Sequence, residues 1–198
     1  GVSESDMFPG ALFTVHVQDH PLSKLADVDW SQKPDFEGIT PKLNLKSADL
    51  ADLPDNTGIL VEGYLKLPKD NNFVFRLSSD DGSKLWINEQ LIIDHDGLHG
   101  AGPKDGETAL AEGYHPFRIE FFQGAGGKSL EFMWRSFNDA QFDYVPSSVM
   151  MHDREDRPEN AIAMGQQTQI PGDGFPVNAV HPSYDLSQAR PDDFLPKV

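Results

Sequence analysis

The strongest constraint on the fold is a succession of short strand-like segments that starts at Gly58 and is interrupted only by turns. Residues 59–67 alternate between apolar and polar side chains approximately by twos, which is the pattern of a half-buried strand. No segment shows a helical period of comparable length. Many short strands separated by turns are typical of a β-sandwich or β-barrel, so an all-β fold is predicted.

Turn-forming residues mark the limits of the expected strands. Residues 18–58 are expected to be irregular because four prolines interrupt them, and residues 94–106, with four glycines, are expected to form a surface loop. Asn88 and Glu89 predict a tight hairpin turn, although the usual glycine is missing. Strands are expected at residues 9–17, 59–67, 73–77, 84–87, 90–93, 108–110, 114–122 and 129–134.

The composition excludes several classes of function. The 198 residues include 32 Asp and Glu against 16 Lys and Arg, which gives a formal net charge of −16. Such a surface repels phosphate groups, so neither nucleic acid nor an anionic membrane is expected as a partner. The absence of cysteine excludes disulfides, thiolate catalysis and cysteine-ligated zinc. No apolar run is long enough to span a bilayer, and a chain that opens at Gly1 without methionine is expected to be processed or excised from a larger protein.

Two adjacent aspartates, Asp80 and Asp81, stand between two expected strands within Ser78-Ser-Asp-Asp-Gly82. Paired carboxylates in such a loop are hard oxygen ligands of the kind that calcium prefers. Neighbouring side chains of an extended strand point to opposite faces, so both carboxylates reach one ion only if the backbone departs from that geometry. A cis peptide bond between them would bring this about.

A glycine-rich loop, Gln123 to Gly127, is a second candidate for ion binding. Three glycines in five positions leave backbone carbonyl groups accessible, and carbonyl and amide oxygens are suitable calcium ligands. Taken alone, the loop is also typical of a flexible hairpin. It is not a phosphate-binding loop, because the lysine and the following helix of that motif are missing.

The stretch from Phe73 to Asp94, which contains the paired aspartates, resembles the core signature of the PA-14 domain, the protective-antigen-like β-sandwich. Residues 112–122 are similar to the Gly-x-His strand of that family, and residues 130–134 to its closing strand. The similarity runs from about Pro9 to about His152 and is densest over residues 58–135. It implies an antiparallel β-sandwich of the PA-14 type at residues 1–152, followed by an irregular tail or linker at residues 153–198.

The resemblance also implies a binding site. In lectin members of the family, which include yeast flocculins and bacterial adhesins, two consecutive aspartates joined by a cis peptide bond bind calcium, and that motif falls on Asp80 and Asp81. The Gln123 side chain and the Gly126 carbonyl group would complete the protein ligands, and vicinal hydroxyls of a sugar would fill the open positions of the ion. Ligand contacts are expected at Asp80, Asp81, Gln123, Gly124, Ala125, Gly127 and His99.

Catalysis by this segment is not expected. A glycosidase needs two acids about 5–10 Å apart on opposite sides of the scissile bond, whereas adjacent acids gathered on one ion do not meet that requirement. A Gly-x-Ser-x-Gly nucleophile motif is absent from the sequence. Asp94 and Asp96 could support the calcium loop or contact a sugar, although acids in loops are more often solvated.

We therefore predict a calcium-dependent carbohydrate-binding module of an extracellular, cell-surface or periplasmic protein. The alternative is a structural or docking domain of an extracellular multidomain enzyme, in which calcium serves only to hold the fold together. Residues 180–194 carry a His-Pro…Arg-Pro stretch that resembles the lead-in to β-propeller sugar-dehydrogenase-like domains, which favours a downstream domain in the same protein. A metal site with no open coordination position would favour the alternative.

Overall fold

The computed structural model describes residues 3–41, 43–51 and 53–157. These residues form thirteen β-strands and three short 3-10 helices, so the predicted all-β fold is confirmed. No helix within the described ranges is both long and apolar enough to cross a membrane. The elements are η1 (Glu4–Asp6), β1 (Met7–Pro9), β2 (Ala11–Val17), η2 (Leu25–Asp27), β3 (Phe36–Thr40), β4 (Asn44–Leu45), β5 (Thr57–Leu67), β6 (Asn71–Asp80), β7 (Ser83–Ile87), β8 (Gln90–His95), β9 (Gly102–Leu110), β10 (Gly113–Gln123), β11 (Ser129–Ser136), β12 (Asp143–Tyr144), β13 (Met150–Asp153) and η3 (Arg154–Asp156).

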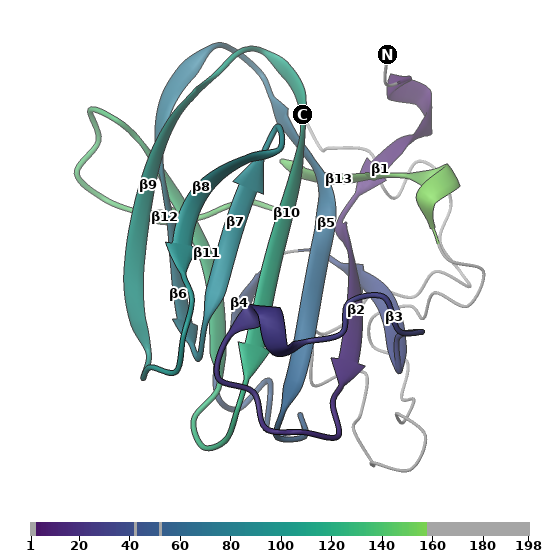
Figure 1. The fold of residues 1–198 in the computed structure, drawn as a ribbon. Helices are drawn as coiled ribbons and strands as arrows, with labels where there is room; N and C mark the ends of the chain where they lie inside the picture. The colour runs from purple at the N-terminus through teal and green to yellow at the C-terminus, as the bar shows by residue number, and fades with distance from the viewer. Residues whose placement is uncertain (1–2, 42, 52, 158–198) are drawn as a thin grey trace.

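The strands form two antiparallel sheets that lie one against the other as a sandwich (Figure 1). The larger sheet has the strand order β1-β13-β5-β10-β7-β8, and β2 and β3 join it because β2 pairs with both β3 and β5. The smaller sheet has the order β12-β11-β6-β9, with β4 paired to β11. Of the two architectures that the strand pattern allowed, the chain therefore adopts the sandwich.

The main core lies between the two sheets. Alternation along β6 explains its formation, because Phe75 and Leu77 are fully buried while Arg76 between them is partly exposed. Aromatic rings connect the layers: the Phe132 ring of the smaller sheet lies 5.7 Å from that of Phe75 and 6.0 Å from that of Phe117 in the larger sheet, measured between centroids. This packing fixes the two sheets relative to each other.

A second, smaller apolar cluster lies at one end of the sandwich. Leu22, Leu25 and Val28, from the connection between β2 and β3, pack against Phe122 near the end of β10, with Trp30 beside them. In Figure 1 this connection crosses in front of the lower ends of β5 and β10. The cluster therefore attaches a long loop to the edge of the sandwich where β10 ends.

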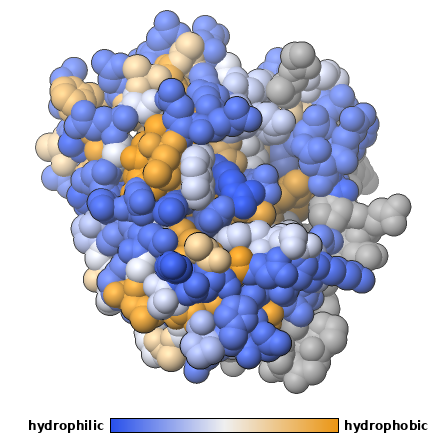
Figure 2. Space-filling view, viewed as in Figure 1, coloured by the Kyte–Doolittle hydropathy of each residue, from blue (hydrophilic) through white to orange (hydrophobic). Residues whose placement is uncertain are grey.

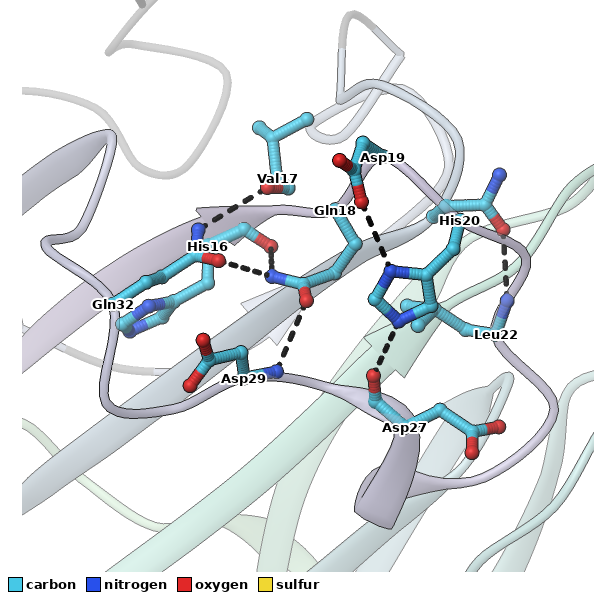
Figure 3. Close-up of polar contacts among 10 residues, drawn as sticks. His16, Val17, Gln18, Asp19, His20, Leu22, Asp27, Asp29 and Gln32 are labelled. Carbon is cyan, nitrogen blue, oxygen red and sulfur yellow. Dashed lines mark hydrogen bonds and ion pairs between the residues drawn. The ribbon is translucent and has the colours of Figure 1, made fainter.

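Polar contacts fix the same connection (Figure 3). The Gln18 side chain donates to Gln32 Oε1 over 3.1 Å, and its own Oε1 accepts from the Asp29 backbone N–H over 3.0 Å. Farther along, the Leu22 N–H donates to Asn56 Oδ1 over 3.1 Å. The connection is thus tied both to itself and to the segment that leads into β5.

Several predicted boundaries were wrong. Residues 18–58 are not wholly irregular, because they contain β3 and β4. The loop predicted at residues 94–106 is only a turn at residues 96–101, since β8 continues to His95 and β9 begins at Gly102. The glycine-rich start of β9 gives no alternating pattern, yet its backbone pairs with β6 from Gly102 opposite Ser79 onward.

The hairpin turn predicted at Asn88 and Glu89 is confirmed. Asn88 and Glu89 form the two-residue turn between β7 and β8, and both adopt positive φ angles, of 51° and 66°. Asn accommodates such angles better than most residues, whereas Glu adopts them here without the usual glycine. Residue 152, after which the tail was predicted to begin, lies within β13, and residues 158–198 of the predicted tail, including the stretch at 180–194, lie outside the described residues.

Candidate functional site

The paired aspartates lie where the chain passes from the smaller sheet to the larger one. Asp80 is the last residue of β6, and Asp81 and Gly82 connect it to β7. The peptide bond between Asp80 and Asp81 is cis, as predicted. The Asp81 N–H donates to the Phe122 carbonyl over 3.2 Å, and the Phe122 N–H donates to the Gly82 carbonyl over 3.0 Å. The junction is therefore held against the end of β10.

The glycine-rich loop contacts both carboxylates. The Gly124 N–H donates to Asp81 Oδ2 over 2.8 Å. A Cβ atom added at Gly127 would lie 2.7 Å from Asp80 Oδ2, so only glycine fits there without displacing that carboxylate. The two loops that were singled out separately in the sequence thus come together in one site.

Gln123, the last residue of β10 and the first of the glycine-rich loop, is buried with 0% of its surface exposed. Its Nε2 atom donates to the Gly126 carbonyl over 3.3 Å, while its Oε1 atom is buried without a hydrogen-bond partner. A buried amide oxygen left unpaired costs about 1–3 kcal/mol. The Gln123 Oε1 atom is therefore available to coordinate a bound ion.

Electrostatic repulsion between the carboxyl groups also favours a bound cation. Burial raises the pKa of the Asp80 carboxyl group, and the Asp81 carboxyl group, within hydrogen-bonding reach, raises this pKa further. The charge of the nearby His99 ring lowers the same pKa to a smaller extent. A cation held between Asp80 and Asp81 would offset both the burial and the repulsion.

The chemistry of the available ligands suits calcium. Within the described ranges, no group of three or more His, Cys, Asp or Glu side chains is placed to hold a metal ion. The set at this site is instead two carboxylates, one amide oxygen and backbone carbonyl groups. Such an all-oxygen set fits calcium, whereas zinc and copper favour nitrogen or sulfur.

The remaining predicted ligand contacts lie around this centre. Gly124 is buried, whereas Ala125, Gly126 and Gly127 are exposed at the tip of their loop. His99 lies on the neighbouring turn between β8 and β9.

Both ring nitrogens of His99 face carbonyl groups of its own turn. Nε2 lies 2.8 Å from the His95 oxygen, and Nδ1 lies 2.9 Å from the Gly100 oxygen. His99 can therefore offer a ligand the face and edge of its ring rather than a ring nitrogen.

The two loop acids considered from the sequence differ in their surroundings. Asp94 is exposed, and its carboxylate lies 4.0 Å from the Lys84 ammonium group. Asp96 Oδ1 accepts hydrogen bonds from the backbone N–H groups of Leu25, over 2.9 Å, and of Gly97, over 2.8 Å. Asp96 therefore ties the β8–β9 turn to η2.

Asn56 is a positioning residue that sequence reasoning missed. Its N–H donates to the Gly124 carbonyl over 2.8 Å, and its carbonyl accepts from the Gln18 N–H over 2.8 Å. Its φ angle of 56° lies in the left-handed region, which asparagine tolerates. The turn residues around Asn56 were visible in the sequence, but nothing there indicated that Gly124 would be its partner.

Comparison with known proteins identifies the family of the chain. The model of the PA14 domain matches residues 15–151 of the chain. No curated protein sequence matches it. Among solved structures, the PA14 sugar-binding domain from an RTX adhesin is similar, with 21% identity and a TM-score of 0.63 over 73% of this chain and 99% of that one.

Two further structures share the fold at lower identity. The PA14 domain of the MpAFP antifreeze protein is 15% identical, with a TM-score of 0.64 over 77% of this chain and 95% of that one. The epithelial adhesin 9 A domain from Candida glabrata, in complex with Galβ1-3GlcNAc, is 10% identical, with a TM-score of 0.60 over 80% and 96%. The family match spans most of the chain and these structures share its sandwich, so the chain belongs to the PA14 domain family.

Proposed function

We propose that this chain is a calcium-dependent carbohydrate-binding module. The observation that carries the proposal is that the Asp80–Asp81 pair lies against the glycine-rich loop that begins at the buried Gln123, whose Oε1 atom has no hydrogen-bond partner. These three side chains and the Gly126 carbonyl group would hold the ion. A bound calcium ion supplies further coordination positions, which vicinal hydroxyls of a sugar can fill.

The burial of the ligands indicates the side from which a sugar would approach. Gln123 is fully buried and only 6% of Asp81 is exposed, so these residues form the floor of the site. Asp80 is partly exposed, and Ala125 is among the exposed residues at the loop tip. A sugar would therefore reach the ion between this loop tip and the β8–β9 turn.

The geometry favours binding over hydrolysis. The two carboxylates are adjacent and lie on the same side of any ligand bound through the ion. Glycoside hydrolysis needs acids about 5–10 Å apart that flank the scissile bond. The same pair held on one cation would fix hydroxyl groups without acting on the glycosidic bond.

Two of the similar structures support carbohydrate as the partner. One is described as a sugar-binding domain from an RTX adhesin, and another contains the disaccharide Galβ1-3GlcNAc. Both are adhesins, which supports a place for this chain outside the cell or at its surface.

Isothermal titration calorimetry with calcium, and then with a panel of monosaccharides and glycans, tests the proposal. We expect one calcium site, and sugar binding that disappears when EDTA is added. Asp81→Asn should abolish both, whereas the matched control Asp94→Asn, at an exposed aspartate outside the site, should retain both. Sugar binding that resists EDTA, or no binding across a broad glycan panel, would contradict the proposal. Calcium binding that raises the melting temperature without any glycan binding would favour the alternative of a structural or docking domain.

A further inference from the structure

Leu98 is the most exposed large hydrophobic residue in the part of the chain that the structure describes, with 60% of its surface exposed. It lies in the β8–β9 turn beside the candidate site. A Cβ atom added at Gly124 would lie 3.1 Å from Leu98 Cδ2 and 3.3 Å from Asp81 Oδ2. A leucine methyl group and a candidate ligand carboxylate therefore border the same point. An apolar side chain at the entrance of a polar site needs an explanation.

The turn that carries Leu98 is firmly held. Asp96 ties it to the Leu25 N–H through a hydrogen bond of 2.9 Å. The His95 and His99 rings stack with a centroid distance of 4.0 Å, and the His99 ring also bonds to the His95 carbonyl. A turn that is already ordered presents its side chain to a ligand without a further entropic cost of ordering.

A single exposed leucine is common on protein surfaces and by itself indicates nothing. Leu91 gives a direct comparison, because it is 49% exposed and lies on β8, over which Figure 2 shows apolar surface. Leu91 pairs with Trp86 on β7, away from the aspartates. Leu98 differs from Leu91 because its Cδ2 atom lies close to Gly124, beside Asp81: a Cβ atom at Gly124 would be 3.1 Å from Leu98 Cδ2 and 3.3 Å from Asp81 Oδ2.

We propose that Leu98 is an apolar contact for the bound sugar, and that the site prefers sugars with a face or edge free of hydroxyl groups beside their vicinal diol. This inference rests on the proposed calcium-dependent binding of a diol. The oxygen ligands would fix the hydroxyls, while Leu98 would cover the C–H groups next to them. A few polar groups that set orientation, together with apolar surface that adds contact area, are typical of small-molecule sites. Burial of those C–H groups against leucine removes apolar surface from water.

The test compares Leu98→Ala with the matched control Leu91→Ala in the full chain at saturating calcium. The ligands are D-glucose, D-galactose, D-mannose, L-fucose and, as a diol without a ring, glycerol. We expect Leu98→Ala to bind the preferred monosaccharide about fourfold more weakly, which corresponds to roughly one methylene group less of buried apolar surface. Its affinity for calcium and for glycerol should stay at the wild-type value. Leu91→Ala should be unchanged throughout, and Leu98→Met should retain the wild-type sugar affinity.

Each possible result decides the question. Unchanged monosaccharide affinity in Leu98→Ala would overturn the inference while leaving calcium-dependent sugar binding intact. An equal loss for glycerol or for calcium would overturn it too, because Leu98 would then support the ion site rather than contact the sugar. If the wild-type protein binds calcium but none of the sugars or glycans, the proposed function fails and the inference fails with it.

Discussion

His152 on β13 is buried in a neutral form and should make the fold sensitive to mild acid. Only 1% of its surface is exposed. Its Nδ1 atom lies 2.9 Å from the Gly10 carbonyl, and its Nε2 atom accepts a hydrogen bond of 2.9 Å from the Arg157 guanidinium. Burial lowers the pKa of His152 to about 4, and the Arg157 charge acts in the same direction, while the Gly10 carbonyl opposes it.

The sign of the effect follows from the two pKa values. The pKa of His152 is 6.5 in a model peptide and about 4 in the folded protein. Between those pH values the unfolded chain binds a proton that the folded chain does not, so the free energy of unfolding falls as the pH falls from 6.5 to about 4. At about 1.4 kcal/mol for each pH unit, the full loss is about 3 kcal/mol.

The variant His152→Gln isolates this contribution. Glutamine stays neutral, can donate to the Gly10 carbonyl and can accept from Arg157. Urea unfolding of both proteins between pH 8 and pH 4.5 should show the wild type losing stability relative to the variant below pH 6.5, by about 1.4 kcal/mol for each pH unit. All other titrating groups are shared by the two proteins, so they cancel in the difference.

His20→Gln provides a control of opposite sign. The Asp27 carbonyl and the Asp19 carboxylate raise the pKa of the exposed His20, so protonation of His20 stabilises the fold at low pH and that contribution is lost as the pH rises through its folded value. Parallel stability curves for the wild type and His152→Gln between pH 7 and pH 4.5 would refute the reasoning, because they would show that His152 takes up its proton equally in the folded and unfolded states.

Substitutions at Asp80, Gly127 and Asn56 give further tests of the candidate site. Asp80→Asn should raise the melting temperature in EDTA. Burial and the Asp81 carboxyl group raise the pKa of Asp80, so the ionised Asp80 destabilises the metal-free fold at neutral pH. The same variant should no longer be stabilised by added calcium. Gly127→Ala should weaken calcium binding in calorimetry about tenfold, or about 1.4 kcal/mol, because its Cβ would crowd Asp80, whereas Gly100→Ala, with no atom near the added Cβ, should bind normally. Asn56→Ala should destabilise the protein in urea by about 2 kcal/mol, through the lost bond to Leu22 and the positive φ angle, and Asn56→Gly by about half as much. Equal effects of the two Asn56 variants would show that the backbone conformation contributes nothing.

The sequence allowed the paired aspartates and the glycine-rich loop to be identified because each is a short local pattern. The predicted cis bond between Asp80 and Asp81 is present, and the Gly124 N–H of the glycine-rich loop donates to Asp81. Most of β9 could not be found in the same way, because only its last residues, 108–110, were predicted to form a strand. Its side chains are mostly exposed, and it exists as a strand because its backbone pairs with β6 along its whole length. Local propensity carries little information about such pairing.

The surroundings of the site depend on contacts between distant parts of the chain. Asp96 accepts from Leu25, 71 positions away, and Gly124 accepts from Asn56. Each of these residues alone would be interpreted as an ordinary turn residue. Their roles appear only when the β2–β3 connection packs on Phe122, and no periodic pattern in the sequence specifies that packing.

The position of the site follows from the topology of the sandwich. The chain passes between the two sheets from β6 to β7, through Asp80 and Asp81, and again from β10 to β11, through the glycine-rich loop. Because β6 pairs with β11 in one sheet and β7 pairs with β10 in the other, these two crossings are neighbours in both layers. Asp80 lies opposite Ser129, and Ser83 lies opposite Phe121. A ligand held by both crossings would therefore bridge four strands, so calcium and the packing of the two sheets should stabilise each other.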